Sequence, residues 1–320
     1  MDAKNAFEAI EAIRATVPVE DQAGLDAEYA TRFKVIGEAV GTVAVAETAP
    51  APETQLEKKL PDFLNPDIKL GAKDQLTLMR EFWNDLGYVV PDLSSEQETR
   101  LEATVDSSLG SRVVPTPLLD LTGRMHVAAS ASELFKKNSF HPDCEALRAP
   151  GTSYTYGKLM ANPESTVKVG RKEYGLRYKT PDGEIVSRAS YIESLVSAGQ
   201  AVVAEDGTVW TFPVMDVRMR APRTRNYAAK LLERISAVST PESLITMQLL
   251  HQANGTPNSE WEVDFANEAV YELDKNGKLV ALVSVTSVDW DPDSRQLYLD
   301  DWDAGSRNDN FGVRAEESGL

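Results

Sequence analysis

Aspartate and tryptophan are concentrated near the C-terminal end of the chain, within residues 269–303. The tripeptide Asp-Trp-Asp occurs there twice, at residues 289–291 and 301–303. Carboxylate oxygens are the ligands that Mg²⁺ and Ca²⁺ prefer, so Asp289, Asp291 and Asp293 are candidate metal ligands. The spacing lacks the glycine and the distal glutamate of an EF-hand loop, and aspartate is also a common turn residue. We therefore expect no cofactor, with Mg²⁺ or Ca²⁺ as the alternative.

The same stretch predicts three antiparallel strands joined by two tight turns. Pairing across the turn at residues 292–294 leaves one aspartate group at the turn and the other at the far end of the returning strand. That arrangement argues against a shared metal. The indole rings either pack in the core of this sheet, which we favour, or bind cationic groups of a partner. The candidate partner-binding residues here are Trp290, Trp302, Asp301 and Asp303.

A basic run interrupts this acidic chain between residues 218 and 234. Its cations are Arg218, Arg220, Arg223, Arg225, Lys230 and Arg234, opposed only by Asp216 and Glu233. Three hypotheses follow, in decreasing order of preference: a salt-bridged surface, a contact with the acidic C-terminal edge of another copy, and a contact with phosphates. We take Arg218, Arg220, Arg223 and Arg225 as candidate partner-binding residues.

Known catalytic motifs are missing from the sequence. His141 and Cys144 have a spacing that could share a metal, but a structural zinc site takes four ligands and the chain holds only three histidines and one cysteine. We find no Gly-x-Gly-x-x-Gly, Walker, Gly-x-Ser-x-Gly or His-Glu-x-x-His pattern. We therefore lean against an enzyme.

The net charge of −17 limits the classes of partner. Such a field repels polyanions, so nucleic acid is disfavoured. The single cysteine rules out an intramolecular disulfide, and the N-terminal residues resemble neither a secretory signal nor a transit peptide. With no long apolar run, we expect no membrane contact. These features place the protein in the cytoplasm, or in a particle assembled there.

Periodicity and composition predict an α+β fold in five segments. These are a helical hairpin arm (1–40), a Pro/Ala-rich linker (41–68), an α-rich region with a long loop (69–165), a hairpin–helix–hairpin module (166–215), and two helices followed by a three-stranded meander and an acidic tail (216–320). The fold thus combines an arm, an α-rich middle and two small antiparallel β units joined by helices.

The arm on its linker, the acidic charge and the opposed basic run favour a non-enzymatic interaction or assembly protein. A structural component of a multi-subunit particle such as a phage virion fits, with protein partners in a homo-oligomer or among particle subunits. One alternative is a metal-dependent hydrolase or nuclease that uses Asp289, Asp291 and Asp301. The other is an acidic regulator that mimics the charge of nucleic acid.

Overall fold

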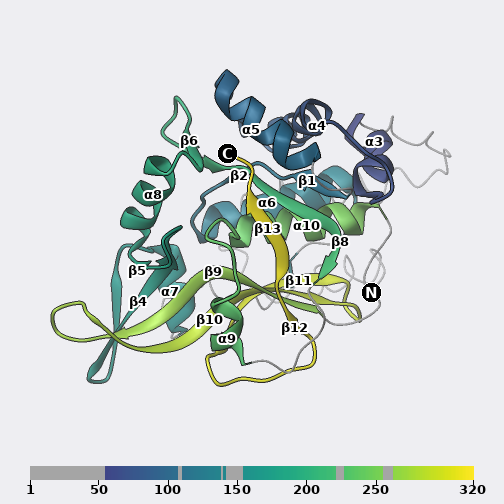
Figure 1. Cartoon of the computed structure of the whole chain (residues 1–320). Helices are drawn as coiled ribbons and strands as arrows, with labels where there is room; N and C mark the ends of the chain where they lie inside the picture. Colours follow the sequence, from purple (N-terminus) through teal and green to yellow (C-terminus); the bar gives the residue numbers. More distant parts are fainter. Residues whose placement is uncertain (1–54, 107–109, 138–139, 142–153, 221–226, 255–261) are drawn as a thin grey trace, which may run out of the picture. The chain divides into compact units, whose positions relative to one another are not determined.

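The computed structural model describes residues 55–106, 110–137, 140–141, 154–220, 227–254 and 262–320. The chain divides between Glu53 and Thr54, so all described residues belong to the second unit. The predicted arm (1–40) and residues 41–54 of the predicted linker lie outside the described part. Helices and antiparallel sheets together confirm an α+β fold (Figure 1). No helix in the described ranges is long and apolar enough to cross a membrane.

The largest sheet is built around the predicted meander. Strands β9 (Glu262–Leu273), β10 (Leu279–Asp291) and β11 (Gln296–Asp303) pair antiparallel as expected. The other edge of β9 pairs with β4 (Lys172–Lys179). β4 in turn pairs with β3 (Thr166–Val169), which gives the order β11-β10-β9-β4-β3. Two short strands extend this sheet: β5 (Ile185–Val186) pairs with β4, and β12 (Phe311–Gly312) pairs with β9.

The pairing of β4 with β9 changes the predicted organisation. Segment 166–215 does not stand as a separate module, because its first hairpin and the C-terminal meander form one sheet. Its second hairpin, β6 (Ala201–Val203) with β7 (Val209–Thr211), belongs instead to a three-stranded sheet with β2 (Thr116–Pro117). A third sheet has the order β1-β8-β13 and consists of β1 (Ser111–Val113), β8 (Pro213–Arg220) and β13 (Arg314–Ser318).

A bulge distorts β9 at its centre. Val285 pairs with Ala269 and Ser287 with Phe265, so three residues of β9 lie opposite Thr286 alone. Asn267 holds this irregular stretch: its side chain accepts from Lys179 N at 2.9 Å and donates to Lys179 O at 2.9 Å and Ala237 O at 2.8 Å. The regular pairing of β4 with β9 ends at Arg177 and Ala269, and beyond it the Asn267 side chain bonds the backbone of Lys179 in β4. Bulges of this kind re-aim side chains, here that of Glu268.

Helix α10 (Pro241–Ala253) lies at the centre of the fold. Thr240 caps it, accepting from Ser243 N, and Pro241 occupies the first turn, both favoured residue types at these positions. Every residue of α10 from 241 to 250 is buried, because α6 (Leu121–Phe135), α3 (Gln55–Leu64), β9 and β10 pack against it.

Helix α3 (Gln55–Leu64) occupies part of the predicted linker. Leu56, Leu60 and Phe63 recur at helical spacing and are buried, which offsets the cost of Pro61 inside the helix. Arg112 of β1 closes its end, donating to Asn65 O at 2.8 Å and Ile68 O at 2.9 Å. The linker prediction was therefore wrong for residues 55–64, since it weighed proline and alanine content above the apolar spacing.

The remaining helices cover the sheets. α4 (Ala72–Asp85) and α5 (Ser95–Asp106) pack near β1, and α7 (Thr155–Ala161) lies against β3 and β4, within the predicted long loop. α8 (Arg188–Ser197), capped by Ser187, contacts β4 and β6. The short α9 (Ala228–Leu232) lies on the face of β9 and β10 that carries Phe265 and Val285.

We predict that Asn267→Ala lowers the free energy of unfolding by about 2 kcal/mol, because it leaves partly buried backbone groups of Lys179 and Ala237 without partners. Urea unfolding measures the loss. Asn276→Ala, in the exposed turn between β9 and β10, is the matched control and should cost about 0.5 kcal/mol or less. Equal losses for the two variants would show that Asn267 does not hold the bulge.

Candidate functional site

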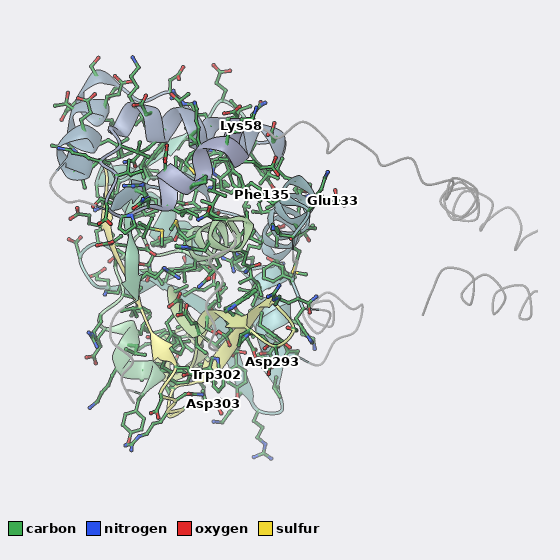
Figure 2. The ribbon with its side chains drawn as sticks, turned by 90° about the vertical axis from the view of Figure 1, so that its right-hand side faces the viewer. Lys58, Glu133, Phe135, Asp293, Trp302 and Asp303 are labelled. Atoms are coloured by element: carbon green, nitrogen blue, oxygen red, sulfur yellow. The ribbon has the colours of Figure 1, made fainter. Side chains whose placement is uncertain are left out.

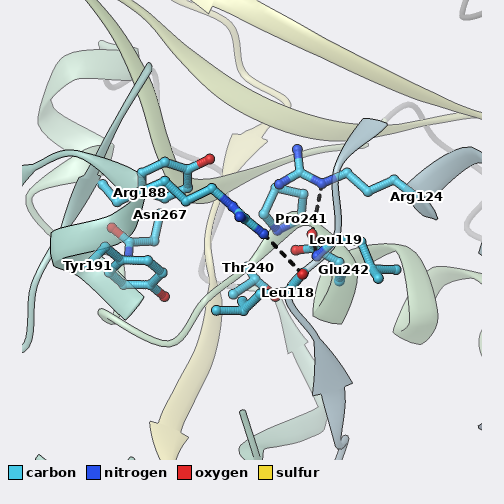
Figure 3. Close-up of a pocket in the computed structure, with 10 residues that line it drawn as sticks. Leu118, Leu119, Arg124, Arg188, Tyr191, Thr240, Pro241, Glu242 and Asn267 are labelled. Carbon is cyan, nitrogen blue, oxygen red and sulfur yellow. Dashed lines mark hydrogen bonds and ion pairs between the residues drawn. The ribbon is translucent and has the colours of Figure 1, made fainter. Parts of the chain in front are cut away.

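A polar pocket lies where the N-terminus of α10 meets the bulge of β9 (Figure 3). Its side chains come from α6, α8, α10, β4, β9 and the segment that follows β2. The lining residues are Leu118, Leu119, Arg124, Tyr178, Arg188, Tyr191, Thr240, Pro241, Glu242 and Asn267. The pocket has room for about one water molecule, so it is too small to bind a metabolite.

Arg124 of α6 is shared by two buried carboxylates. Its Nε donates to Glu242 Oε1 at 2.8 Å, and its Nη2 and Nη1 donate to Glu268 Oε2 and Oε1 at 2.7 and 3.1 Å. The three side chains are 4%, 2% and 0% exposed. Buried charges at this depth persist only when they are paired, so this ionic triad joins α6, α10 and β9.

Glu268 is held as a carboxylate by further donors. Thr286 Oγ1 and Tyr156 OH donate to its Oε1 at 2.9 and 3.2 Å. Burial alone would raise the pKa of Glu268, but the charge and hydrogen bonds of Arg124 outweigh it and lower that pKa below its usual value. Tyr156, buried beside Glu268, has a raised pKa and stays protonated. The triad is thus a fixed ion pair with no space for a substrate, and its role is structural.

The aspartates of residues 289–303 lie on two faces and at two ends of the hairpin formed by β10 and β11. Asp289 pairs with Tyr298 and Asp301 with Thr286, three residues apart on β10, so their side chains lie on opposite faces of the sheet. Asp291 accepts from Asp293 N at 2.9 Å and Ser294 Oγ at 2.7 Å, which makes it a turn residue. Figure 2 shows Asp293 and Asp303 apart. The described residues contain no group of three or more His, Cys, Asp or Glu placed to hold a metal ion.

The outer end of β11 carries a hydrogen-bonded cluster of its own. Tyr154 OH contacts Asp300 Oδ1 at 2.6 Å and also Asp301, which Ser284 contacts in turn. Burial raises the pKa of Asp301, although these hydrogen bonds act against the rise. Asp303, the last residue of the strand, is exposed.

The two tryptophans differ in their surroundings. Trp290 is 1% exposed and packs in the main core, so partner binding through its ring would need the core to open. Trp302 is half-buried against Phe311, with ring centroids 5.1 Å apart, and donates from Nε1 to Asp289 Oδ2 at 3.1 Å. Of the two rings, only that of Trp302 reaches the surface.

The basic run falls partly outside the described residues. Arg223 and Arg225 lie there, as do the side chains of Arg218 and Arg220, whose backbone belongs to β8 at the centre of its sheet. Tyr227, at the start of α9, carries the guanidinium of Arg307 at 3.9 Å and the ammonium of Lys230 at 5.8 Å from its ring centroid. These are cation–π contacts within the chain.

The histidines have different neighbours and come from different elements. His141 stacks on Tyr298 at 4.2 Å, whereas His126 of α6 lies 6.0 Å from the ring of Tyr88. Burial lowers the pKa of His251 on α10 to about 3, so its ring stays neutral. Cys144 lies outside the described residues.

An open groove that the sequence did not suggest runs beside β6. It has a volume of about 610 Å³ and is lined by residues 89–92, which follow α4, and by residues 202–206 at the end of β6. Val89 and Val203 are 75% and 52% exposed there. The pattern of adjacent valines at an edge strand was visible in the sequence, but only the fold brings the two segments together.

The ends of two hairpins form a second exposed apolar feature. The turn between β3 and β4 exposes Val169, and the turn between β9 and β10 exposes Leu279 and Val280. The two ends are neighbours in the sheet, since Glu173 pairs with Leu273, and the Lys172–Glu272 ion pair joins them at 2.6 Å. We call residues 168–173 and 272–280 the hairpin ends.

Comparison of the chain with protein-family models, curated proteins and solved structures gave no match. We therefore infer a function from the geometry of the described residues.

We predict that Arg124→Met lowers the free energy of unfolding by about 3–5 kcal/mol, because it leaves two carboxylates buried without a cation. Arg80→Met is the matched control: Arg80 pairs with exposed Asp92 at 3.0 Å, and its loss should cost about 1 kcal/mol or less. Adding Glu242→Gln and Glu268→Gln to Arg124→Met should recover part of the stability. Similar urea midpoints for the two single variants would contradict the triad's role.

Asp289 gives a prediction about pH. Burial raises the pKa of its carboxyl to about 7, and the nearby Asp300 adds to the rise. The folded state then keeps a proton that the unfolded state loses above about pH 4, so stability falls as the pH rises from about 4 to about 7. Asp289→Asn, which can still accept from Trp302, should be more stable than the parent at pH 8 by up to about 4 kcal/mol and equal to it near pH 4.

Urea unfolding of both proteins between these pH values measures the difference. Burial also raises the pKa of Glu316 to about 8, but that effect is common to both proteins and cancels in the comparison. Asp303→Asn, at the exposed end of β11, is the control and should show no such trend. If Asp289→Asn raised the free energy of unfolding by the same amount near pH 4 and at pH 8, Asp289 would not be the group that titrates.

Proposed function

We propose that this chain is a non-enzymatic assembly protein, a structural component of a multi-subunit particle such as a phage virion, which associates with further copies of itself or with other subunits. The arm (1–40) and the basic residues Arg218, Arg220, Arg223 and Arg225 are further contact regions in this proposal, as are Trp302, Asp301 and Asp303.

The exposed apolar side chains of the described residues support this proposal, because most of them gather in two places on the surface. Six large hydrophobic residues of the described part are exposed, and five of them lie in the β6 groove or at the hairpin ends. Scattered exposed apolar residues need no explanation, whereas apolar residues gathered at a groove and at a protruding sheet end are typical of protein contacts.

The candidate metal site receives no such support. Asp289, Asp291 and Asp301 lie on two faces of the sheet and at a turn, so their carboxylates do not converge on one point. The geometry of these residues does not favour the hydrolase alternative.

We predict that the purified full chain associates reversibly. Its weight-average mass in sedimentation or light scattering should rise with protein concentration at physiological salt and fall as more salt is added, because charged contacts are screened. A single species with the mass of a monomer at every concentration and salt level would rule out self-association.

A further inference from the structure

The β6 groove is both apolar and acidic. Val89 and Val203 give it exposed apolar walls, and Asp92, Glu205 and Asp206 are exposed along it. No lysine or arginine lies among its lining residues, although Arg80 pairs with Asp92 from outside. An occupant should therefore combine apolar side chains with positive charge.

The hairpin ends have the complementary chemistry. Beside Val169, Leu279 and Val280 they carry five cations, against three carboxylates, in a chain whose net charge is −17. The cations are Lys168, Arg171, Lys172, Lys275 and Lys278, and the carboxylates are Glu173, Glu272 and Asp274. Asp274 accepts from Asn276 N and Lys278 N at 2.8 and 2.9 Å, and these backbone donors lower its pKa and keep it charged within its own turn.

Both features also contain the outer strand of a sheet. β6 ends the order β2-β7-β6 and β3 ends the order β11-β10-β9-β4-β3, and neither has a second neighbouring strand in the described ranges. Unpaired strand edges present backbone donors and acceptors that another strand can use.

We propose that the hairpin ends of one copy seat in the β6 groove of the next copy. Val169, Leu279 and Val280 face Val89 and Val203, while the lysines and Arg171 face Asp92, Glu205 and Asp206. The occupant is a second copy because this chain itself supplies the matching charge and apolar residues. This inference rests on the proposed function, for which it names the contact surfaces.

The contact uses two different surfaces, so it is heterologous. Each copy offers one groove and one set of hairpin ends, and repeated contacts give a ring or an open filament rather than a closed dimer. The small area of a sheet end in a groove makes a single contact weak, so it acts through repetition within an assembly.

Three variants of the full chain test the proposal. The end variant carries Leu279→Asp and Val280→Asp, and the groove variant carries Val89→Asp and Val203→Asp. The control is Val196→Asp on α8, which changes the one exposed large hydrophobic residue of the described ranges that lies outside both features. Circular dichroism and thermal unfolding confirm that each variant folds.

We expect the end and groove variants each to associate at least about tenfold more weakly than the parent, and the control to be unchanged. A mixture of the two variants retains one intact groove and one intact set of hairpin ends. It should therefore form one-to-one dimers that grow no further, as seen by sedimentation and native mass spectrometry.

Parental association in either variant alone, or no dimer in the mixture, overturns this contact while leaving self-association itself in place. A different occupant of the groove, such as the N-terminal arm, would give the first of these results. A parent chain that stays monomeric overturns both proposals.

Discussion

The guanidinium of Arg124 lies between the carboxylates of Glu242 and Glu268, and so fixes three elements at one point in the core. Removing three charges from water is costly, and the attraction within the triad offsets that cost only while all three side chains keep their geometry. Helix α10 can be buried on nearly all sides because Glu242, at its first turn, has this partner. The same arginine fixes the bulge of β9, since Glu268 belongs to the three residues that lie opposite Thr286.

The bulge in turn determines what the large sheet exposes. Its centre is anchored on α6 through the Glu268–Arg124 pair and on β4 through Asn267, so the strands of both hairpins are buried near the bulge and become exposed beyond it. Leu279 and Val280 lie past the region that the helices cover, as does Val169 on the neighbouring hairpin. The exposed apolar residues at the hairpin ends are thus a consequence of where the core stops.

Local signals in the sequence were sufficient for much of the fold. Ser187 and Thr240 are favoured N-cap residues and begin helices, Gly183 and Gly207 take positive φ in turns, and the meander pairs in its expected order. These features depend on a few adjacent residues. The pairing of β4 with β9 and the burial of Arg124 depend on residues more than ninety positions apart, and nothing in the local pattern of either strand or helix indicates them. For the candidate residues, alternation along β10 places Asp289 and Thr286, the partner of Asp301, on opposite faces, and this follows from the strand period once the register is known.

Electrostatics explains how an assembly protein can be acidic overall and still associate. Copies with a charge of −17 repel one another at long range, which keeps free chains apart and soluble. A contact must therefore gain its attraction locally, over distances shorter than the screening length of about 8 Å at physiological salt. In the proposed contact, clustered lysines at a sheet end meet this condition, because they would lie beside three carboxylates of a groove. The long-range repulsion between copies would also limit the affinity of each such contact.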